Sequence, residues 1–315
     1  MEPHPDPADY PFDLDTTLES IVSVRAQIPE DGLTAPILGT ERNGHGVLIE
    51  DPDLVLTVGY LITEAESVWL VDYSGNTVPA HTLSYDQETG FGLIQALGPL
   101  QAEPMPLGRS SELKVGDRVI VAGAGGIEQA ISTNLVGKRE FAGHWEYVLD
   151  EALFTTPAHD NWSGAALIDS RGLLCGIGSL VLQTRSDNGS VHNANLMIPI
   201  DVLHPVLDDL RRYGRRNQPG RPWLGWFVQE TEHGLVVAGT YQSGPAATAG
   251  ISTGDVIHEV GGETIEDLAS LFRTIWALGD AGVEIPLTLM RDGDVHNIVV
   301  HSVDRYSCLK TASIH

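Results

Sequence analysis

The sequence predicts a mainly β protein with more than one domain, and three observations lead to this prediction. Short runs rich in β-branched residues, bounded by Gly, Pro, Asp or Asn, recur through the first two hundred positions. A basic, Pro- and Gly-rich segment, 214–221, then has the composition of an interdomain linker. Four further strand patterns follow it. Short strands at this spacing are typical of barrels and sandwiches, and 315 residues suffice for two or three domains.

The strand patterns of the first region come in five clear runs. They lie at 20–26, 46–50, 54–58, 67–71 and 118–122. A Gly-rich segment follows the last run, but Glu128 stands where a dinucleotide-binding loop needs its third glycine. We therefore interpret residues 123–126 as a tight turn, and Asn188-Gly189-Ser190 as the turn of a hairpin.

Two helices are predicted, one on each side of the linker. The first spans 199–213, with Asp201 as its N-cap and Gly214 as its stop. The second spans 265–278, where apolar residues recur at helical spacing. Strands are predicted around this second helix at 234–239, 255–260, 284–290 and 295–301. The tail, 306–315, shows no pattern, so we expect it to be disordered.

Composition excludes several classes of partner. The chain has 43 acidic against 18 basic side chains and a net charge of −25, which repels nucleic acid and anionic membrane surfaces. No apolar run is long enough to span a bilayer. Residues 1–16 are acidic and lack the basic and apolar regions of a signal peptide, so we expect a cytoplasmic location. Cys175 lies in an apolar run and is expected to be buried and unreactive.

Several longer segments carry a more specific signal. Residues 107–117 read LGRSSELKVGD and residues 161–167 read NWSGAAL; further along, 223–226 read WLGW and 243–257 read SGPAATAGISTGDVI. These segments resemble the HtrA/Deg family of serine proteases. The resemblance implies a trypsin-like domain of two six-stranded β-barrels over 15–213, after an N-terminal segment 1–14. It also implies a PDZ domain, a small β-barrel with helices, over 222–305.

The resemblance identifies Ser163 as the position of the catalytic nucleophile. The family's base histidine aligns with Tyr60, and its orienting aspartate aligns with Gly90. The amides of Asn161 and Ser163 would form the oxyanion hole, with Asn161 replacing a glycine. A phenol with a pKa near 10 does not accept a serine proton at neutral pH. Loss of such a unit lowers turnover by about 10⁶-fold, so we expect a vestigial nucleophile and no proteolysis.

Two alternatives to an inactive protease stay open. His45, His81, His159 or Asp160 could replace the missing base, which would make the protein an active serine endopeptidase with a non-standard base. The same histidines could instead bind a metal ion in the vacated cleft. None of them shows a metal-ligand spacing such as H-x-x-x-H, so we expect neither a metal nor another cofactor.

The PDZ resemblance assigns the carboxylate-binding loop to Trp223, Leu224, Gly225 and Trp226. A peptide C-terminus would add as a strand to the segment after Gly225, facing the helix that starts near Ile265. Both tryptophans could also pack in the core. The sequence thus predicts an HtrA-like pseudoprotease that binds peptides or protein C-termini, as an adaptor, scaffold or regulatory subunit.

The resemblance also bears on assembly and location. HtrA proteins are typically trimers built through the N-terminal segment, where Tyr10, Pro11 and Phe12 would supply an apolar contact. We therefore expect a homotrimer. Family members mostly work outside the cytoplasm behind a signal or anchor, and because residues 1–16 show neither, the cytoplasmic expectation is kept.

Overall fold

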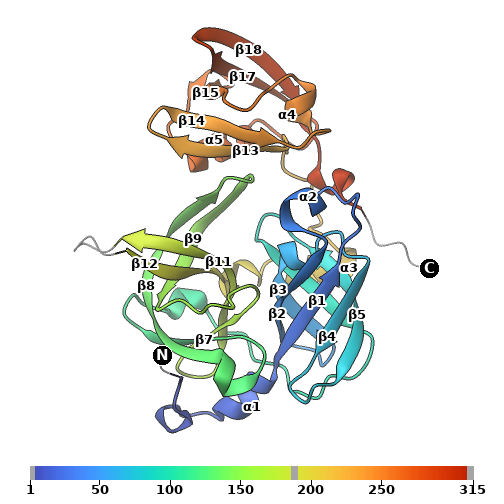
Figure 1. Ribbon diagram of the computed structural model, residues 1–315, viewed down its shortest axis with the longest axis vertical. Helices are drawn as coiled ribbons and strands as arrows, with labels where there is room; N and C mark the ends of the chain where they lie inside the picture. The colour runs from blue at the N-terminus through green and yellow to red at the C-terminus, as the bar shows by residue number, and fades with distance from the viewer. Residues whose placement is uncertain (1–3, 186–190, 311–315) are drawn as a thin grey trace. The chain divides into compact units, whose positions relative to one another are not determined.

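The structure is a computed structural model, and it describes residues 4–185 and 191–310. Its residues form two compact units (Figure 1). Unit 1 comprises Met1–Arg139, Glu151–Asn217 and Lys310–His315, and unit 2 comprises Glu140–Asp150 and Gln218–Leu309. The predicted boundaries assigned residues 140–150 to the first domain, whereas their contacts group them with the second.

The first half of unit 1 is a closed antiparallel barrel with the strand order β1-β2-β3-β6-β5-β4. Its strands are β1 (Ile21–Gln27), β2 (Glu41–Leu48), β3 (Leu54–Val58), β4 (Ser67–Val71), β5 (Thr77–Tyr85) and β6 (Phe91–Ala96). Every residue of β3 is buried, so its outward-facing side chains are covered as well as those that point into the barrel. The predicted runs at 54–58 and 67–71 match β3 and β4 end to end.

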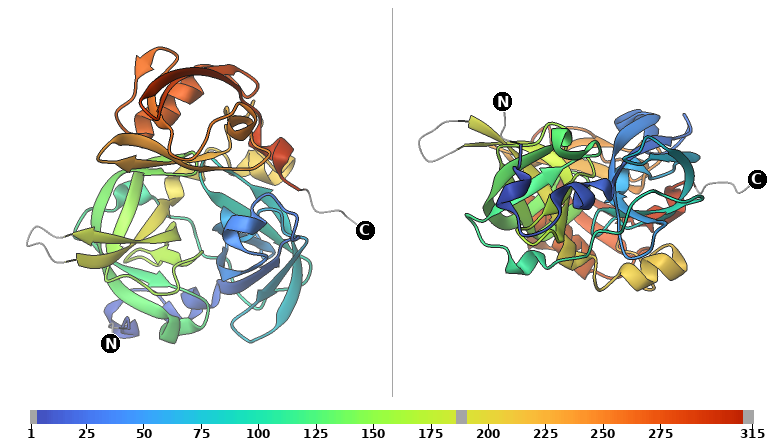
Figure 2. Two further views of the ribbon diagram at one scale, coloured as in Figure 1. Left: turned by 45° about the horizontal axis from the view of Figure 1, so that its top comes forward. Right: turned by 90° about the horizontal axis from the view of Figure 1, so that it is seen from below.

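The second half of unit 1 is another closed barrel, with the order β10-β11-β12-β9-β8-β7, and the two barrels lie side by side (Figure 2). Its strands are β7 (Arg118–Ala122), β8 (Ala130–Gly143), β9 (Tyr147–Thr156), β10 (Ala166–Ile168), β11 (Leu174–Arg185) and β12 (Val191–Pro199). The predicted double six-stranded barrel is therefore confirmed. The end of β8 and the start of β9 form the tip of a hairpin that belongs to unit 2.

Short helices connect the strands of unit 1. They are η1 (Pro7–Asp9), α1 (Leu14–Glu19), α2 (Ala35–Leu38), η2 (Gly59–Leu61), η3 (Ser110–Glu112), η4 (Gly126–Gln129), η5 (Ile200–Val202) and α3 (Leu207–Tyr213). The helix predicted over 199–213 is wrong in its first half. The Asp201 carboxylate does not cap its own helix but accepts hydrogen bonds from the amides of Ser110 and Ser111, at 2.9 and 3.0 Å. Gly214 ends α3 in the left-handed conformation, as predicted.

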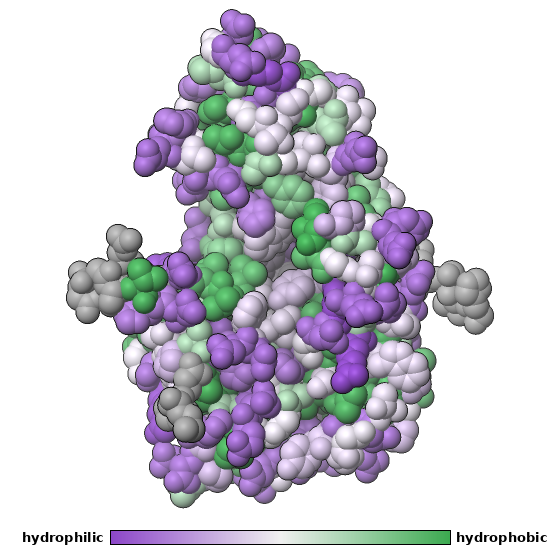
Figure 3. Space-filling view, viewed as in Figure 1, coloured by the Kyte–Doolittle hydropathy of each residue, from purple (hydrophilic) through white to green (hydrophobic). Residues whose placement is uncertain are grey.

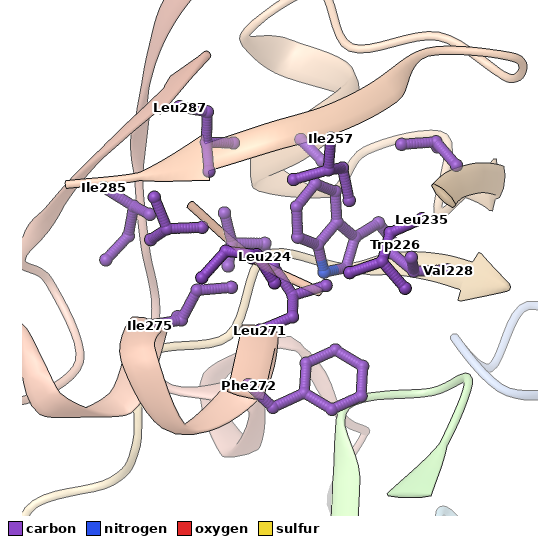
Figure 4. Close-up of a cluster of buried hydrophobic side chains, with 14 of the residues drawn as sticks. Leu224, Trp226, Val228, Leu235, Ile257, Leu271, Phe272, Ile275, Ile285 and Leu287 are labelled. Carbon is purple, nitrogen blue, oxygen red and sulfur yellow. The ribbon is translucent and has the colours of Figure 1, made fainter. Parts of the chain in front are cut away.

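Unit 2 contains a six-stranded sheet in the order β13-β14-β15-β17-β18, with β16 paired to β15. Its elements are β13 (Trp226–Thr231), β14 (Gly234–Thr240), α4 (Pro245–Thr248), β15 (Val256–Val260), β16 (Glu263–Thr264), α5 (Leu268–Ala277), β17 (Glu284–Arg291), β18 (Asp294–His301) and η6 (Arg305–Cys308). The helix α5 starts three residues later than predicted because Asp267 forms a capping box with Ser270. The same helix packs its apolar side, including Leu271 and Phe272, into the core (Figure 4).

The remaining expectations concern the tail, a turn, Cys175 and membrane spans. The tail predicted to be disordered begins within the short helix η6, which Asp304 caps by accepting a hydrogen bond from the amide of Tyr306. The predicted turn at Asn188-Gly189-Ser190 lies outside the described residues. Cys175 is fully buried, and burial raises the pKa of its thiol to about 12.

Hydrophilic side chains cover much of the face drawn in Figure 3. No helix among the described residues has the length and apolarity that a membrane crossing requires.

Candidate functional site

The turn that carries Ser163 lies between β9 and β10 and is fixed by its backbone. The amide of His45 donates to the Ser163 carbonyl at 2.8 Å, and the Gly164 amide donates to the Gly178 carbonyl at 2.9 Å. Gly164 has a φ of 77°, and a Cβ on it would lie 1.9 Å from the His45 carbonyl oxygen. Only glycine fits there. The half-exposed Ser163 is therefore held in a defined position beside strand β2.

Ser163 faces an open cleft of about 540 Å³ in unit 1. The cleft is lined by Ser23, Val24, Arg25, Asn43, Gly44, His45, Asp160, Asn161, Trp162 and Ser163. Its walls combine residues of β1 and β2 with the serine turn, so both barrels contribute to it. A cleft of this size suits a short peptide segment or a small ligand.

Tyr60 lies beside Ser163, on the short helix η2. Its hydroxyl is 2.9 Å from Ser163 Oγ and donates to the Ser179 carbonyl at 2.8 Å. A phenol has one proton and a carbonyl only accepts, so the serine hydroxyl donates to the phenol oxygen when Tyr60 binds Ser179. Burial raises the pKa of the Tyr60 phenol to about 12, and hydrogen bonds with the Ser163 and Trp162 side chains offset only part of this rise. Tyr60 is thus a fixed neutral donor.

Gly90, at the position of the orienting aspartate, contacts the residue before Tyr60 through its backbone and supplies no carboxylate. Its carbonyl accepts from the amide of Gly59, next to Tyr60, at 2.7 Å, and its φ is 82°. The nearby carboxylate of Asp86 is used elsewhere, because the Arg216 guanidinium binds both of its oxygens at 3.0 Å. The structure therefore places Tyr60 beside Ser163, and Gly90 beside Gly59, the neighbour of Tyr60 in the chain.

The two buried or half-buried histidines near the cleft have no available lone pair. His45 Nδ1 accepts from the Ala124 amide at 3.1 Å, and burial first, then His159, lowers the pKa of His45 to about 4. His159 Nδ1 accepts from the Asn161 amide at 3.0 Å, and His159 Nε2 lies 3.0 Å from the Gln129 carbonyl, which only accepts. In each neutral ring the other nitrogen carries the proton. Either histidine must break a backbone hydrogen bond before it can accept a proton.

The other polar candidates have separate places. Asn161 and Ser163 supply the two backbone amides that were predicted to form the oxyanion hole. The Asn161 amide instead donates a hydrogen bond to His159 Nδ1. Asp160 is exposed and lines the cleft, and His81 is exposed on β5. Within residues 4–185 and 191–310, no group of three or more His, Cys, Asp or Glu side chains is placed to hold a metal ion.

The predicted carboxylate-binding loop forms the entry to β13. Gly225 has a φ of 70°, and a Cβ on it would lie 2.9 Å from the Trp223 ring. Trp223 and Trp226 are 5% and 1% exposed, so both pack in the interior of unit 2 while their backbone builds the loop. The two interpretations of these tryptophans are therefore compatible.

The loop already holds a carboxylate, which is that of Glu146 from the tip of the β8–β9 hairpin. Its oxygens accept from the amides of Leu224 at 3.0 Å, Gly225 at 2.9 Å and Trp226 at 3.5 Å. Burial raises the pKa of Glu146 to about 7, although the three amides and Arg305 act in the opposite direction. Sequence reasoning missed Glu146, because it lies 78 to 80 positions from the loop and in no motif.

Comparisons with known proteins agree with this architecture. A model of the trypsin-like peptidase domain matches residues 44–177, and a PDZ domain model matches residues 222–301. A probable periplasmic serine endoprotease DegP-like of Halomonas elongata is 26% identical over 273 residues, which are 82% of this chain and 55% of the relative. The serine protease Do-like HtrA of Lactobacillus helveticus is 26% identical over 284 residues, 81% of this chain and 67% of the relative.

Solved structures show the same fold. The HtrA-type protease AlgW with a decapeptide has a TM-score of 0.54 and 21% identity, covering 92% of this chain and 97% of that one. The chain is thus a trypsin-like peptidase domain followed by a PDZ domain. It is similar to the DegP and HtrA serine proteases, so the resemblance seen in the sequence is confirmed. The chain spans about half the length of the DegP-like relatives it matches.

Two expectations need correction or qualification in this light. The cytoplasmic location is wrong, because the DegP-like relatives are named periplasmic endoproteases and point to the periplasm. The expectation depended only on the composition of residues 1–16, which does not report where a folded domain works. The same names describe serine endoproteases, so the relatives favour the active alternative over the pseudoprotease.

Proposed function

We propose that this chain is an HtrA-like protein that binds peptides or protein C-termini through its PDZ domain, and that Ser163 does not hydrolyse them. It would act as an adaptor, scaffold or regulatory subunit. The observation that carries the proposal is Tyr60, whose hydroxyl lies 2.9 Å from Ser163 Oγ in the place of a base and donates to the Ser179 carbonyl.

The proton inventory of the cleft supports an unactivated serine. With a pKa of about 12, the phenolate of Tyr60 is populated to only about 10⁻⁵ at pH 7. His45 and His159 both use their acceptor nitrogen for a backbone amide. A serine without a base is a weak nucleophile, and loss of the unit lowers turnover by about 10⁶-fold.

Peptide binding is supported by the loop and strand of unit 2. The amides of Leu224, Gly225 and Trp226 converge on one carboxylate, which is how an added peptide strand is held at its C-terminus. Two AlgW structures with similar folds contain a tripeptide and a decapeptide. The names of the DegP-like relatives describe them as periplasmic, and we propose the periplasm as the compartment for this function.

A second candidate is an active serine endopeptidase, which the names of the relatives favour. It requires a base that reaches Ser163 after rearrangement. Asp160, which lines the same cleft, and the two histidines are the groups available for that role. The metal-binding alternative has no comparable observation in its favour within the described residues.

One experiment separates the two candidates. The protein and its Ser163→Ala variant are incubated with unfolded casein and, separately, with a fluorophosphonate probe, with trypsin as the positive control. We expect no serine-dependent cleavage and labelling indistinguishable between the two proteins. Cleavage or labelling that disappears in Ser163→Ala would establish the endopeptidase and reject the inactive protein.

A further inference from the structure

The tip of the β8–β9 hairpin, Glu140–Asp150, packs against the PDZ domain. Both belong to the same compact unit, although the hairpin lies far from the PDZ domain in the sequence. Three groups of contacts define this arrangement: a carboxylate in the loop, a backbone hydrogen bond along β13, and side-chain contacts with the core and with α5.

The first contact is the carboxylate of Glu146. This side chain is 4% exposed and takes the three loop amides that would receive a peptide's C-terminal carboxylate. Its backbone has a φ of 62°, a conformation that is uncommon for residues other than glycine, asparagine and aspartate. The surrounding contacts therefore hold Glu146 in a backbone shape that it does not prefer by itself.

The second contact runs along the edge of β13. The amide of Val228 donates to the carbonyl of His144 at 3.0 Å, and the His144 ring lies 6.0 Å from the ring of Phe227. His144 precedes the carboxylate-bearing residue by two positions. Residues 144–146 form the turn of the hairpin, so one backbone hydrogen bond from this turn reaches the β13 edge, where the strand of a bound peptide would pair.

The third contact involves the core and α5. Val148 packs into the apolar cluster of unit 2, part of which is shown in Figure 4. Arg273 on α5 binds Glu140 and Asp150, each at 2.6 Å, and so ties both strands of the hairpin to the helix. The hairpin thus reaches from β13 to α5, the two elements that bound a PDZ peptide groove.

We infer that the 140–150 hairpin is an internal ligand of the PDZ groove, and that a peptide with a free C-terminal carboxylate binds only by displacing Glu146. This inference rests on the proposed peptide-binding function. An internal ligand competes at the high effective concentration that its covalent link provides. The apparent affinity for an external peptide is then lower by the fraction of molecules in which the groove is open.

The test compares the wild-type protein, Glu146→Gln and a matched control, Glu151→Gln. Glu151 is a half-exposed residue of β9, the strand that follows the Glu146 turn, and its carboxylate pairs with Lys138 instead of the loop amides. The probe is a fluorescein-labelled pool of eight-residue peptides ending in Val, Leu or Phe with a free carboxylate, and the same pool with amidated C-termini. Binding is followed by fluorescence anisotropy.

We expect Glu146→Gln to bind the carboxylate pool at least tenfold more tightly than wild type, with Glu151→Gln unchanged and the amidated pool bound weakly by all three. Because an amide can retain part of the contact, Glu146→Ala is measured alongside and should show an equal or larger gain. Equal affinity of all four proteins for the carboxylate pool would overturn the inference.

Hydrogen exchange at the amides of Leu224, Gly225 and Trp226 separates this inference from the proposed function. If no protein binds either pool, peptide binding fails as the function. Faster exchange at these amides in Glu146→Ala would even then support the internal contact. Unchanged exchange would reject it.

Discussion

The serine cleft and the PDZ groove differ in what each contains. The cleft is open, about 540 Å³, and keeps a positioned serine beside a tyrosine and a glycine that supply no base and no carboxylate. The groove has its three amide donors in place, but all three donate hydrogen bonds to the carboxylate of Glu146 from the same chain. One site lacks partners, whereas the other already has one.

This difference determines how each site responds to substitution. If the proposed function holds, proteolysis in the cleft requires the addition of a base and of a partner that orients the base. In the groove, the proposed internal ligand means that peptide binding increases when the Glu146 carboxylate is removed. The two sites therefore call for opposite kinds of variant.

The largest expected effect comes from rebuilding the cleft. We expect Tyr60→His combined with Gly90→Asp to raise fluorophosphonate labelling of Ser163 by about 10²- to 10⁴-fold, the range that a positioned general base contributes. Ser163→Ala on this background should abolish the labelling. A folded double variant that labels no faster than wild type would show that the cleft lacks more than the two side chains.

A smaller effect is expected from pH acting on the groove. The pKa of docked Glu146 is about 7, above the ordinary value of 4.5 expected for the undocked hairpin, so the docked state binds the proton more tightly. Docking is strongest below pH 4.5 and weakens as pH rises towards 7. Between pH 5 and 7.5 the apparent affinity of wild type for the carboxylate peptides should rise roughly 50-fold.

The control for this pH effect is Glu146→Gln. Arg305 also acts on Glu146, and His144, whose pKa burial lowers, lies in the same hairpin; both remain in the variant. Peptide affinity of Glu146→Gln measured by anisotropy should change only a few-fold over the same range. A parallel rise in both proteins would assign the pH dependence to another group.

The smallest effect is expected from Arg273→Ala. This guanidinium bridges Glu140 and Asp150 at the surface, with 44%, 47% and 91% of the three side chains exposed. Exposed ion pairs contribute little, so peptide affinity should rise only about two- to fivefold. An increase as large as that of Glu146→Gln, in the same titration, would mean that the ion pairs hold the hairpin instead of the carboxylate.

Much of the fold could be predicted because local pattern and tertiary contacts agree. The runs at 54–58, 67–71 and 118–122 coincide with β3, β4 and β7, where β-branched residues fill buried positions. The helix predicted from 199 is wrong in its first half because the Asp201 carboxylate binds the amides of Ser111 and Ser110, which lie 90 and 91 positions away. A capping pattern in sequence does not reveal which helix the carboxylate will cap.

The candidate sites divide in the same way. Tyr60, Gly90 and Ser163 could be proposed as the triad positions because each lies in a segment with a recognisable pattern. The structure places Tyr60 beside Ser163 and Gly90 beside Gly59. Glu146 could not be assigned, since its role depends on a hairpin tip meeting a loop 78 positions later. The hydrogen bond from the Asn161 amide to His159 could not be predicted either, because every residue except proline has a backbone amide and the sequence does not show where it donates.

The steric position of Gly164 has a consequence for reading such sequences. A side chain there would collide with the His45 carbonyl, and one at Gly178 would lie 2.0 Å from the Trp162 carbonyl. Only glycine leaves room for the neighbouring backbone at these two positions, whatever chemistry Ser163 performs. The glycine of the Ser163-Gly164 pair is therefore required by the packing of the turn against His45 of β2. Whether such a protein hydrolyses peptides depends on the side chains around the serine.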